Sequence, residues 1–469
     1  MRTICCLVAV LMCGVSFAAK RKPAPLTTAE VEYPLSCNAK AKPLVLEGWN
    51  ALSNGRPEDA REQLRLALRA DPHCVMARAT LGLLGEGWQL DVAAKMADQL
   101  GAFERLHLQV LAASRAGSPQ KAFLLAQRLQ RRAPRVMMAN LTAAQTALAA
   151  EKWNEAAAAA TAATELTPMT GAGWYLLGEA KLHAGLVEEA RTAFLKYAEV
   201  SPGEANAHDA LGDALLASGE VDAAGTSYQR AIDRSKGRHW RAWRGIANVM
   251  ALSGDWTAAR AAIATHRAAA TAPADQLESD VMLAWSYAAQ GRMTEALRTA
   301  SATRAAPLLR GELLLATGRN TEALAAFAAL QGRRLSSVNR ARALAGLSVA
   351  QSRLGKTEAA ANTLRSLERM GTDPSVADQR SYARGALALA QNAPRRALDS
   401  LRECSEPFDA CRLSFIEALE AAGEASEALE ARAALAGANH RDPRYWLIHS
   451  QLTAAGGVAS ERVPNPPAR

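Results

Sequence analysis

Five polar side chains in the middle of the chain have types and spacings that permit chemistry. Glu179 and His183 are four residues apart, one turn of a helix, and His208, Asp209 and Asp213 follow in the next stretch of sequence. Carboxylate and imidazole groups at this spacing can share a metal ion or a proton. The competing interpretation is a solvated helix face with alternating polar residues. We favour that interpretation and predict no catalytic residue and no metal at these positions.

The rest of the sequence lacks the patterns of the common enzyme classes. It contains no H-E-x-x-H motif, no glycine-rich phosphate loop, no G-x-S-x-G elbow and no C-x-x-C pair after its first segment. We therefore predict that the protein is not an enzyme and that it needs no cofactor. A cryptic metal site formed by the five residues above is the least favoured alternative.

Small residues recur with a constant step in the middle of the chain. Alanine recurs every 34 residues and proline keeps the same step, at Ala122, Ala156, Ala190, Ala224, Pro134, Pro168 and Pro202. Five residues before most of these alanines lies a glycine, and elsewhere Asn392 or Glu151 takes its place. Glycine can end one helix in the left-handed conformation, alanine lets a second helix cross the first closely, and proline stops the second helix. Each period therefore predicts two antiparallel helices.

The period from Gly171 to Glu204 carries the clearest pattern. Its characteristic residues are Trp174, Leu177, Gly178, Ala190, Phe194 and Pro202. At these positions the sequence resembles the tetratricopeptide repeat (TPR) family, although Lys181 and Tyr197 depart from that family's tyrosine and small residue. The resemblance implies an all-α fold, a right-handed superhelical solenoid of antiparallel helix pairs with about 11–12 units including degenerate ones.

The TPR-like array is expected to cover residues 41–440. Its units begin near residues 41, 75, 103, 137, 171, 205, 240, 277, 304, 341, 378 and 409. The pattern is weakest at 75–102 and 304–330, and the path of the superhelix there does not follow from the sequence. A helix within residues 441–456 is expected to cap the exposed end of the solenoid.

The two ends of the chain carry different signals. Residues 1–18 combine a basic residue, an apolar run and a small-residue cleavage site, which predicts a secretory signal peptide cleaved after Ala18. An uncleaved anchor and a lipoprotein attached at Cys13 are the alternatives. We expect an extended N-terminal segment at 19–40 and a disordered tail at 457–469, and no later stretch is apolar enough for a transmembrane segment.

Four cysteines follow the signal, at Cys37, Cys74, Cys404 and Cys411. An even number in an exported chain permits disulfides, and the sequence separations favour Cys37–Cys74 and Cys404–Cys411 over the other pairings. Four buried free thiols are the alternative. The signal and the cysteines together predict an exported protein, with the periplasm favoured over the extracellular space.

The net charge of the chain bears on its partners. The formal charge is +9, and the excess of lysine and arginine over aspartate and glutamate is spread along the sequence. A nucleic-acid surface would concentrate positive charge in one region, and export makes such a partner less expected still. We therefore predict no nucleic-acid partner.

The resemblance also implies where a partner would bind. In TPR arrays the first helices of the units line the concave face, and exposed positions on them hold peptides or partner helices. The corresponding positions here are Tyr175, Glu179, Leu182 and His183, then Asn206, Asp209 and Asp213, then Arg241, Arg244 and Asn248. This groove would change from acidic to basic within two units, which suits a partner carrying charges of both signs.

One specialised mode of the family is excluded by the residues present. The chaperone-binding members hold a C-terminal carboxylate with basic residues and asparagines from three units. Arg244 and Asn248 match the first unit, but Met282 replaces the next asparagine, and Ala305 and Leu309 replace the basic residues. We therefore do not expect a carboxylate clamp.

These features predict a non-catalytic protein–protein interaction scaffold in the cell envelope. Its concave groove is expected to bind partner peptides or helices and to assist assembly of an envelope, secretion or polysaccharide-export complex, an assignment that rests on the uses of the fold rather than on particular residues. The alternative is a structural homo-oligomer that stacks through the unit near residue 304. The sequence identifies neither the partner nor the oligomeric state.

Overall fold

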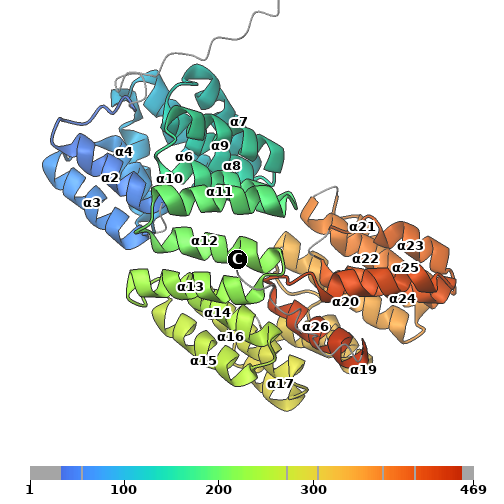
Figure 1. Ribbon diagram of the computed structural model, residues 1–469. Helices are drawn as coiled ribbons and strands as arrows, with labels where there is room; N and C mark the ends of the chain where they lie inside the picture. Colours follow the sequence, from blue (N-terminus) through green and yellow to red (C-terminus); the bar gives the residue numbers. More distant parts are fainter. Residues whose placement is uncertain are drawn as a thin grey trace, which may run out of the picture.

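The structure is a computed structural model (Figure 1) that describes residues 33–53, 56–270, 273–303, 306–371, 374–405 and 408–456. The expected signal peptide, most of the expected N-terminal segment and the expected tail at 457–469 lie outside the described residues. Within those residues the chain is all-helical, apart from the connecting segments.

Twelve antiparallel helix pairs follow one another along the described chain, and one further helix comes after them. The first helices of the pairs are α2 (Ala41–Ser53), α4 (Val75–Leu83), α6 (Ala102–Arg115), α8 (Met137–Ala149), α10 (Gly171–His183), α12 (Ala205–Ala217), α14 (Trp240–Leu252), α16 (Pro273–Ala289), α18 (Ala306–Ala316), α20 (Ser337–Arg353), α22 (Pro374–Ala390) and α24 (Asp409–Ala422). The predicted fold class is confirmed, and each first helix begins within about one turn of its expected start.

The second helices pack against the first helices of their own unit and of the next one. They are α3 (Pro57–Ala70), α5 (Gly87–Lys95), α7 (Pro119–Arg132), α9 (Trp153–Leu166), α11 (Val187–Val200), α13 (Val221–Ser235), α15 (Trp256–Ala269), α17 (Met293–Ser301), α19 (Asn320–Ala328), α21 (Thr357–Glu368), α23 (Pro394–Leu401) and α25 (Ala425–Ala436). The two units expected to be irregular contain short helices, and a 3-10 turn at Ala97–Gln99 follows α5.

The turns inside the units have the conformation that the repeat predicts. Gly185 and Gly219 have φ angles of 76° and 84°, in the left-handed region that glycine adopts without a steric penalty. Glu151 and Asn392, which replace glycine in two units, also have positive φ angles, of 57° and 54°. The two substitutions therefore keep the turn.

Aromatic rings inserted against glycines hold successive helices together. The ring of Tyr228 on α13 is fully buried between Gly212 of α12 and Gly245 of α14. Phe327 lies in the same way between Gly311 of α18 and Gly346 of α20. Because a glycine has no side chain at these points, the ring fills the space where two helices approach most closely.

Both predicted cysteine pairs form disulfides in the structure. Cys37 and Cys74 have Cα atoms 4.8 Å apart, and this bond ties the segment before α2 to the start of α4. Cys404 and Cys411 have Cα atoms 6.5 Å apart and join the turn after α23 to the first turn of α24.

The last helix, α26 (Pro443–Gly456), folds back into the array. It contacts α24 and α25, as a cap on the last unit would, but it packs chiefly against α16 and also contacts α14. Figure 1 shows it in red between the helices of the middle of the array and those of the last units. The reason is apolar surface: Trp446 and Leu447 are almost completely buried and belong to the hydrophobic cluster that contains residues of α14 and α16.

The role of glycine beside an aromatic ring can be tested with a matched pair of substitutions. At Gly212 an added Cβ would lie 2.6 Å from the ring of Tyr228, and this ring cannot move away because Gly245 lies against its other side. At Gly225 the atom nearest to an added Cβ is Val249 Cγ1, at 3.4 Å. We expect Gly212→Ala to destabilise the protein by roughly 1–3 kcal/mol through overpacking, and Gly225→Ala to leave it unchanged or stabilise it by up to about 1 kcal/mol. Thermal unfolding followed by circular dichroism measures both, and equal effects would contradict this account.

Candidate functional site

The helices α10, α12 and α14 carry the ten side chains predicted to line the groove, of which Leu182 is half-buried. The side chains of His183 and Arg241 are exposed, and those of Tyr175, Glu179 and Arg244 are half-buried. The remaining four are buried, with exposed fractions of 2% for Asn206, 5% for Asp209, 7% for Asp213 and 0% for Asn248. The structure therefore brings the predicted positions together, but only some of them face solvent.

Two of the buried positions are contacted by the C-terminal segment of the same chain. Arg441, in the loop before α26, forms an ion pair with Asp213, whose carboxylate also accepts a hydrogen bond of 2.7 Å from Tyr228 Oη. Trp446 of α26 donates a hydrogen bond of 3.1 Å from Nε1 to Asn248 Oδ1. The middle of the groove thus holds a helix, and that helix belongs to the chain itself.

The α26 helix is buried on two sides, by different parts of the array. Trp446 belongs to the hydrophobic cluster that contains Met282 and Trp285 of α16. Tyr445, Ile448 and Leu452 belong to a second cluster, formed with α24 and α25. This burial links units that are far apart in the sequence.

Several of the predicted positions are engaged in contacts within the array. His239 Nε2 lies 3.1 Å from Asp209 Oδ2, and Arg244 forms an ion pair of 3.4 Å with Glu278. Asn206 Nδ2 donates a hydrogen bond of 3.4 Å to Tyr197 Oη. These side chains position neighbouring helices, which the sequence pattern did not reveal.

The aromatic and histidine side chains of α10 pack on their neighbours. The Tyr175 ring lies 5.8 Å from that of Tyr197 and 6.4 Å from that of Phe194. His183 stacks on Trp153, with ring centroids 4.8 Å apart. His183 and Arg241, whose guanidinium lies over the Trp240 ring at 5.2 Å, are the two exposed members of the predicted set.

Glu179 is in an electrostatically unusual position. Burial raises the pKa of its carboxyl to about 7, against an ordinary value of 4.5; Arg441 opposes this shift and Asp213 adds to it. Asp209 behaves differently: although burial works to raise its pKa, His239, Arg244 and Arg241 stabilise the carboxylate and lower the pKa. The acidic side of the groove is therefore only partly ionised near neutral pH.

The segment before α2 occupies the groove of the first units. Tyr33 Oη and His107 Nδ1 are hydrogen-bonded at 2.7 Å, and the Tyr33 ring contacts those of Trp49 and Phe103, with centroids 4.9 and 5.0 Å away. Burial lowers the pKa of His107 to about 4, so this histidine is neutral at physiological pH. The part of the expected extended segment that the structure describes is therefore packed rather than free.

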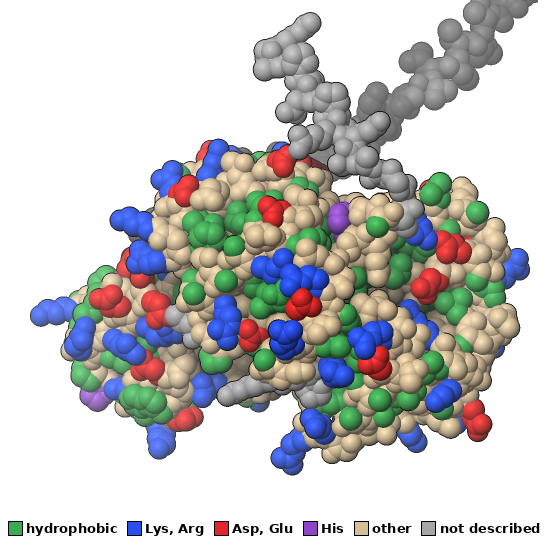
Figure 2. Space-filling view, turned by 90° about the horizontal axis from the view of Figure 1, so that it is seen from below, with side chains coloured by type: hydrophobic (Ala, Val, Ile, Leu, Met, Phe, Trp, Pro, Cys, Tyr) green, Lys and Arg blue, Asp and Glu red, His purple; other side chains and the backbone are tan. Residues whose placement is uncertain are grey.

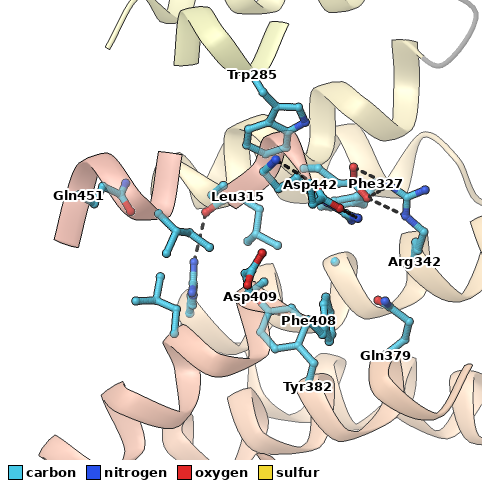
Figure 3. A pocket seen from close by; sticks show the side chains of 18 residues that line it. Trp285, Leu315, Phe327, Arg342, Gln379, Tyr382, Phe408, Asp409, Asp442 and Gln451 are labelled. Atoms are coloured by element: carbon cyan, nitrogen blue, oxygen red, sulfur yellow. Dashed lines mark hydrogen bonds and ion pairs between the residues drawn. The ribbon is translucent and has the colours of Figure 1, made fainter. Parts of the chain in front are cut away.

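A cavity remains in the second half of the groove, beside α26 (Figure 3). Its empty volume is about 890 Å³, part of which is open solvent, and it extends from α16 to α24. Aromatic side chains form much of its wall: Trp285, Phe327, Tyr382 and Phe408.

The charged groups around this cavity are paired with one another. Arg342 donates two hydrogen bonds, of 3.0 and 2.9 Å, to the carboxylate of Glu312. Arg444 of α26 donates to Asp442 at 2.9 and 3.0 Å from Nε, and Arg353 Nη2 lies 3.9 Å from Glu417 Oε1. The wall therefore combines apolar surface with charges that are already neutralised.

Other kinds of site receive no support from the described residues. Within them, no group of three or more His, Cys, Asp or Glu side chains is placed to hold a metal ion, and no helix is long and apolar enough to cross a membrane. On the face shown in Figure 2, basic and acidic side chains are interspersed.

The chain belongs to the tetratricopeptide repeat family. The family model described as "Tetratricopeptide repeat" matches residues 45–86, 141–205, 210–273 and 308–377, together more than half of the chain. The matched ranges contain Tyr175 and Arg244, and Asp209 lies between two of them. No curated protein sequence matches the chain.

Solved structures of other repeat proteins are similar in part. A tetratricopeptide repeat protein from Parabacteroides merdae is 14% identical, with a TM-score of 0.37, and the match covers 62% of this chain and 98% of that one. A thermophilic TPR protein from Thermus thermophilus is 20% identical, with a TM-score of 0.35 and coverages of 42% and 100%. MamA from Desulfovibrio magneticus is 17% identical, with a TM-score of 0.26 and coverages of 44% and 99%. The family assignment rests on the family model, since these TM-scores are low.

The raised pKa of Glu179 predicts a pH-dependent difference in stability. A carboxyl whose pKa is higher in the folded state favours folding below its unfolded pKa, and this advantage is lost as the pH rises through about 7. We expect Glu179→Gln to match the wild type at pH 4 and to become more stable than it as the pH rises, by at most roughly 3 kcal/mol above pH 7. The melting temperature measured across this range is the test.

The control for this experiment is an exposed glutamate of α9. Glu165→Gln should leave the melting temperature unchanged relative to wild type at every pH, because this side chain remains in water in both states. A constant difference between Glu179→Gln and wild type from pH 4 to pH 8 would show that the carboxyl at 179 does not titrate as the structure indicates.

Proposed function

We propose that this protein is an exported, non-catalytic scaffold that binds helical segments of partner proteins in its concave groove. The observation that carries the proposal is the position of α26, which lies in this groove and is held there by Asp213 and Asn248. A surface that already binds one helix offers burial, hydrogen bonds and charge to another. Proteins of the tetratricopeptide repeat family generally serve as scaffolds for protein–protein interaction.

Two features support export. The first eighteen residues have the composition of a secretory signal, and the two disulfides suit an oxidising compartment. We therefore place the protein in the periplasm, with the extracellular space as the second choice, and assign it to the assembly of an envelope, secretion or polysaccharide-export complex. This last assignment follows from the combination of export with a binding fold.

The test uses capture of partners from cell-envelope fractions with the chain from residue 19 onward. The groove variant is His183→Ala/Arg241→Ala, which removes the two exposed side chains of the predicted set without removing a buried ion pair. We expect a specific partner to be retained by the wild type and weakened about tenfold or more by the groove variant, since each lost contact contributes about 1 kcal/mol or less when exposed and more when the complex desolvates it.

The matched control is Lys196→Ala/Arg230→Ala, on the second helices α11 and α13. These side chains are also exposed and basic, but they lie outside the predicted groove positions. The control variant should retain the partner. A partner lost equally from both variants, or from neither, would place binding outside the groove, and recovery of the chain itself alone would favour the homo-oligomer.

A further inference from the structure

The α26 helix fills its place in the groove incompletely. The pocket lies along one side of it, and Arg444, Ile448 and Gln451 of α26 contribute to its lining together with the aromatic side chains. These three positions are spaced by four and three residues, so they form one face of the helix. Part of this pocket is open solvent, so it offers room in which additional apolar side chains could be buried.

A polar group beneath α26 is also left unsatisfied. Asn248 is completely buried; its Oδ1 accepts from Trp446, but its Nδ2 has no hydrogen-bond partner among the described residues. A buried donor without an acceptor is costly, and a well-adapted occupant would supply the acceptor. Both the cavity and this donor indicate a groove shaped for more than α26.

Apart from its apolar contacts, α26 is joined to distant units by a small number of polar groups, and the preceding helix buries few residues. Among the described residues, Arg441, Trp446, His449 and Ser450 make polar contacts with helices outside the last unit, and Ser450 Oγ lies 3.3 Å from the carbonyl oxygen of Ala289. In α25 only Ala428 and Leu435 are buried. Because each unit of a solenoid is stabilised mainly by its neighbours, α26 can leave the groove without disrupting the helix pairs.

We propose that α26 is an exchangeable occupant, and that the partner is an amphipathic helix of another protein that displaces it. This inference rests on the proposed function and adds the class of partner. The partner helix would carry an aromatic residue at the place of Trp446 and bulkier apolar residues at the places of Ile448 and Gln451, where the cavity lies. A basic residue about one and a half turns before the aromatic position would replace Arg441 beside Asp213.

The competition between the two helices follows from mass action. When the groove is closed by α26 in most molecules, the apparent affinity for an added helix is the intrinsic affinity reduced by the open fraction. Any change in the chain that weakens α26 therefore raises the affinity for the added helix. The same substitution made in the added helix lowers the affinity of that helix for the groove.

The experiment measures binding of a fluorescent peptide with the sequence of residues 437–456 to the full chain by anisotropy. Trp446→Ala in the peptide should weaken binding tenfold or more, whereas Trp446→Ala in the chain should strengthen binding of the unmodified peptide by about the same factor. A peptide carrying Gln451→Leu should bind more tightly than the unmodified one, because its side chain enters the cavity.

Two further variants of the chain keep the test decisive. Arg441→Ala removes the ion pair to Asp213 and leaves the hydrophobic clusters intact. This variant should also strengthen peptide binding. It serves as the test if the Trp446→Ala chain does not fold. Thr453→Ala alters an exposed position of α26 and should change nothing. Circular dichroism verifies that each variant is folded.

The outcomes separate the inference from the proposed function. Folded chains of Trp446→Ala and Arg441→Ala that bind the peptide no better than the wild type would overturn the exchange of α26, even if the envelope partner still depends on the groove. A full-length dimer that the peptide dissociates would assign the groove to a second copy of the chain and overturn a foreign helix as the occupant. If the peptide exchanges with α26 as expected but the capture of an envelope partner does not depend on the groove residues, the proposed function is rejected and the exchange of α26 stands.

Discussion

This structure depends on the close approach of helices whose contacting faces carry small side chains. Aromatic residues make up only 5% of the chain and alanine is the most frequent buried residue, while several of the large rings lie where glycine leaves room for them. Tyr228 between Gly212 and Gly245 shows the arrangement in its clearest form. Its hydroxyl then reaches Asp213, so the same ring that joins three helices also orients a carboxylate in the groove.

The repeat itself could be predicted from sequence because it is a local property. Helix ends, left-handed turns and crossing points recur with nearly constant spacing, and even the substitutions at Glu151 and Asn392 keep the turn. The two disulfides were predictable for a similar reason, since each joins neighbouring elements. Burial of Asp209 by His239 was not predictable, because the pattern of a first helix does not show which of its polar residues meet the next unit.

The position of α26 was the main feature that sequence reasoning missed. A terminal helix with Tyr445 and Trp446 was expected to cover the last unit, yet Trp446 bonds to Asn248, nearly two hundred residues earlier. Such a contact depends on the curvature of the whole array, which small deviations in each unit determine. The available signal was the pair of adjacent aromatic residues in a chain poor in them. Their burial against distant helices closes the groove that the repeat pattern predicted to be open.

The place of α26 at the end of the sequence also has a consequence in time. A chain that is synthesised from its N-terminus can form its helix pairs one after another, since these pairs contact mainly the neighbouring units. The groove is complete before the residues that close it have emerged. During that interval α26 does not compete with a partner helix for the groove. The partner helix therefore binds faster to the growing chain than to the completely folded molecule.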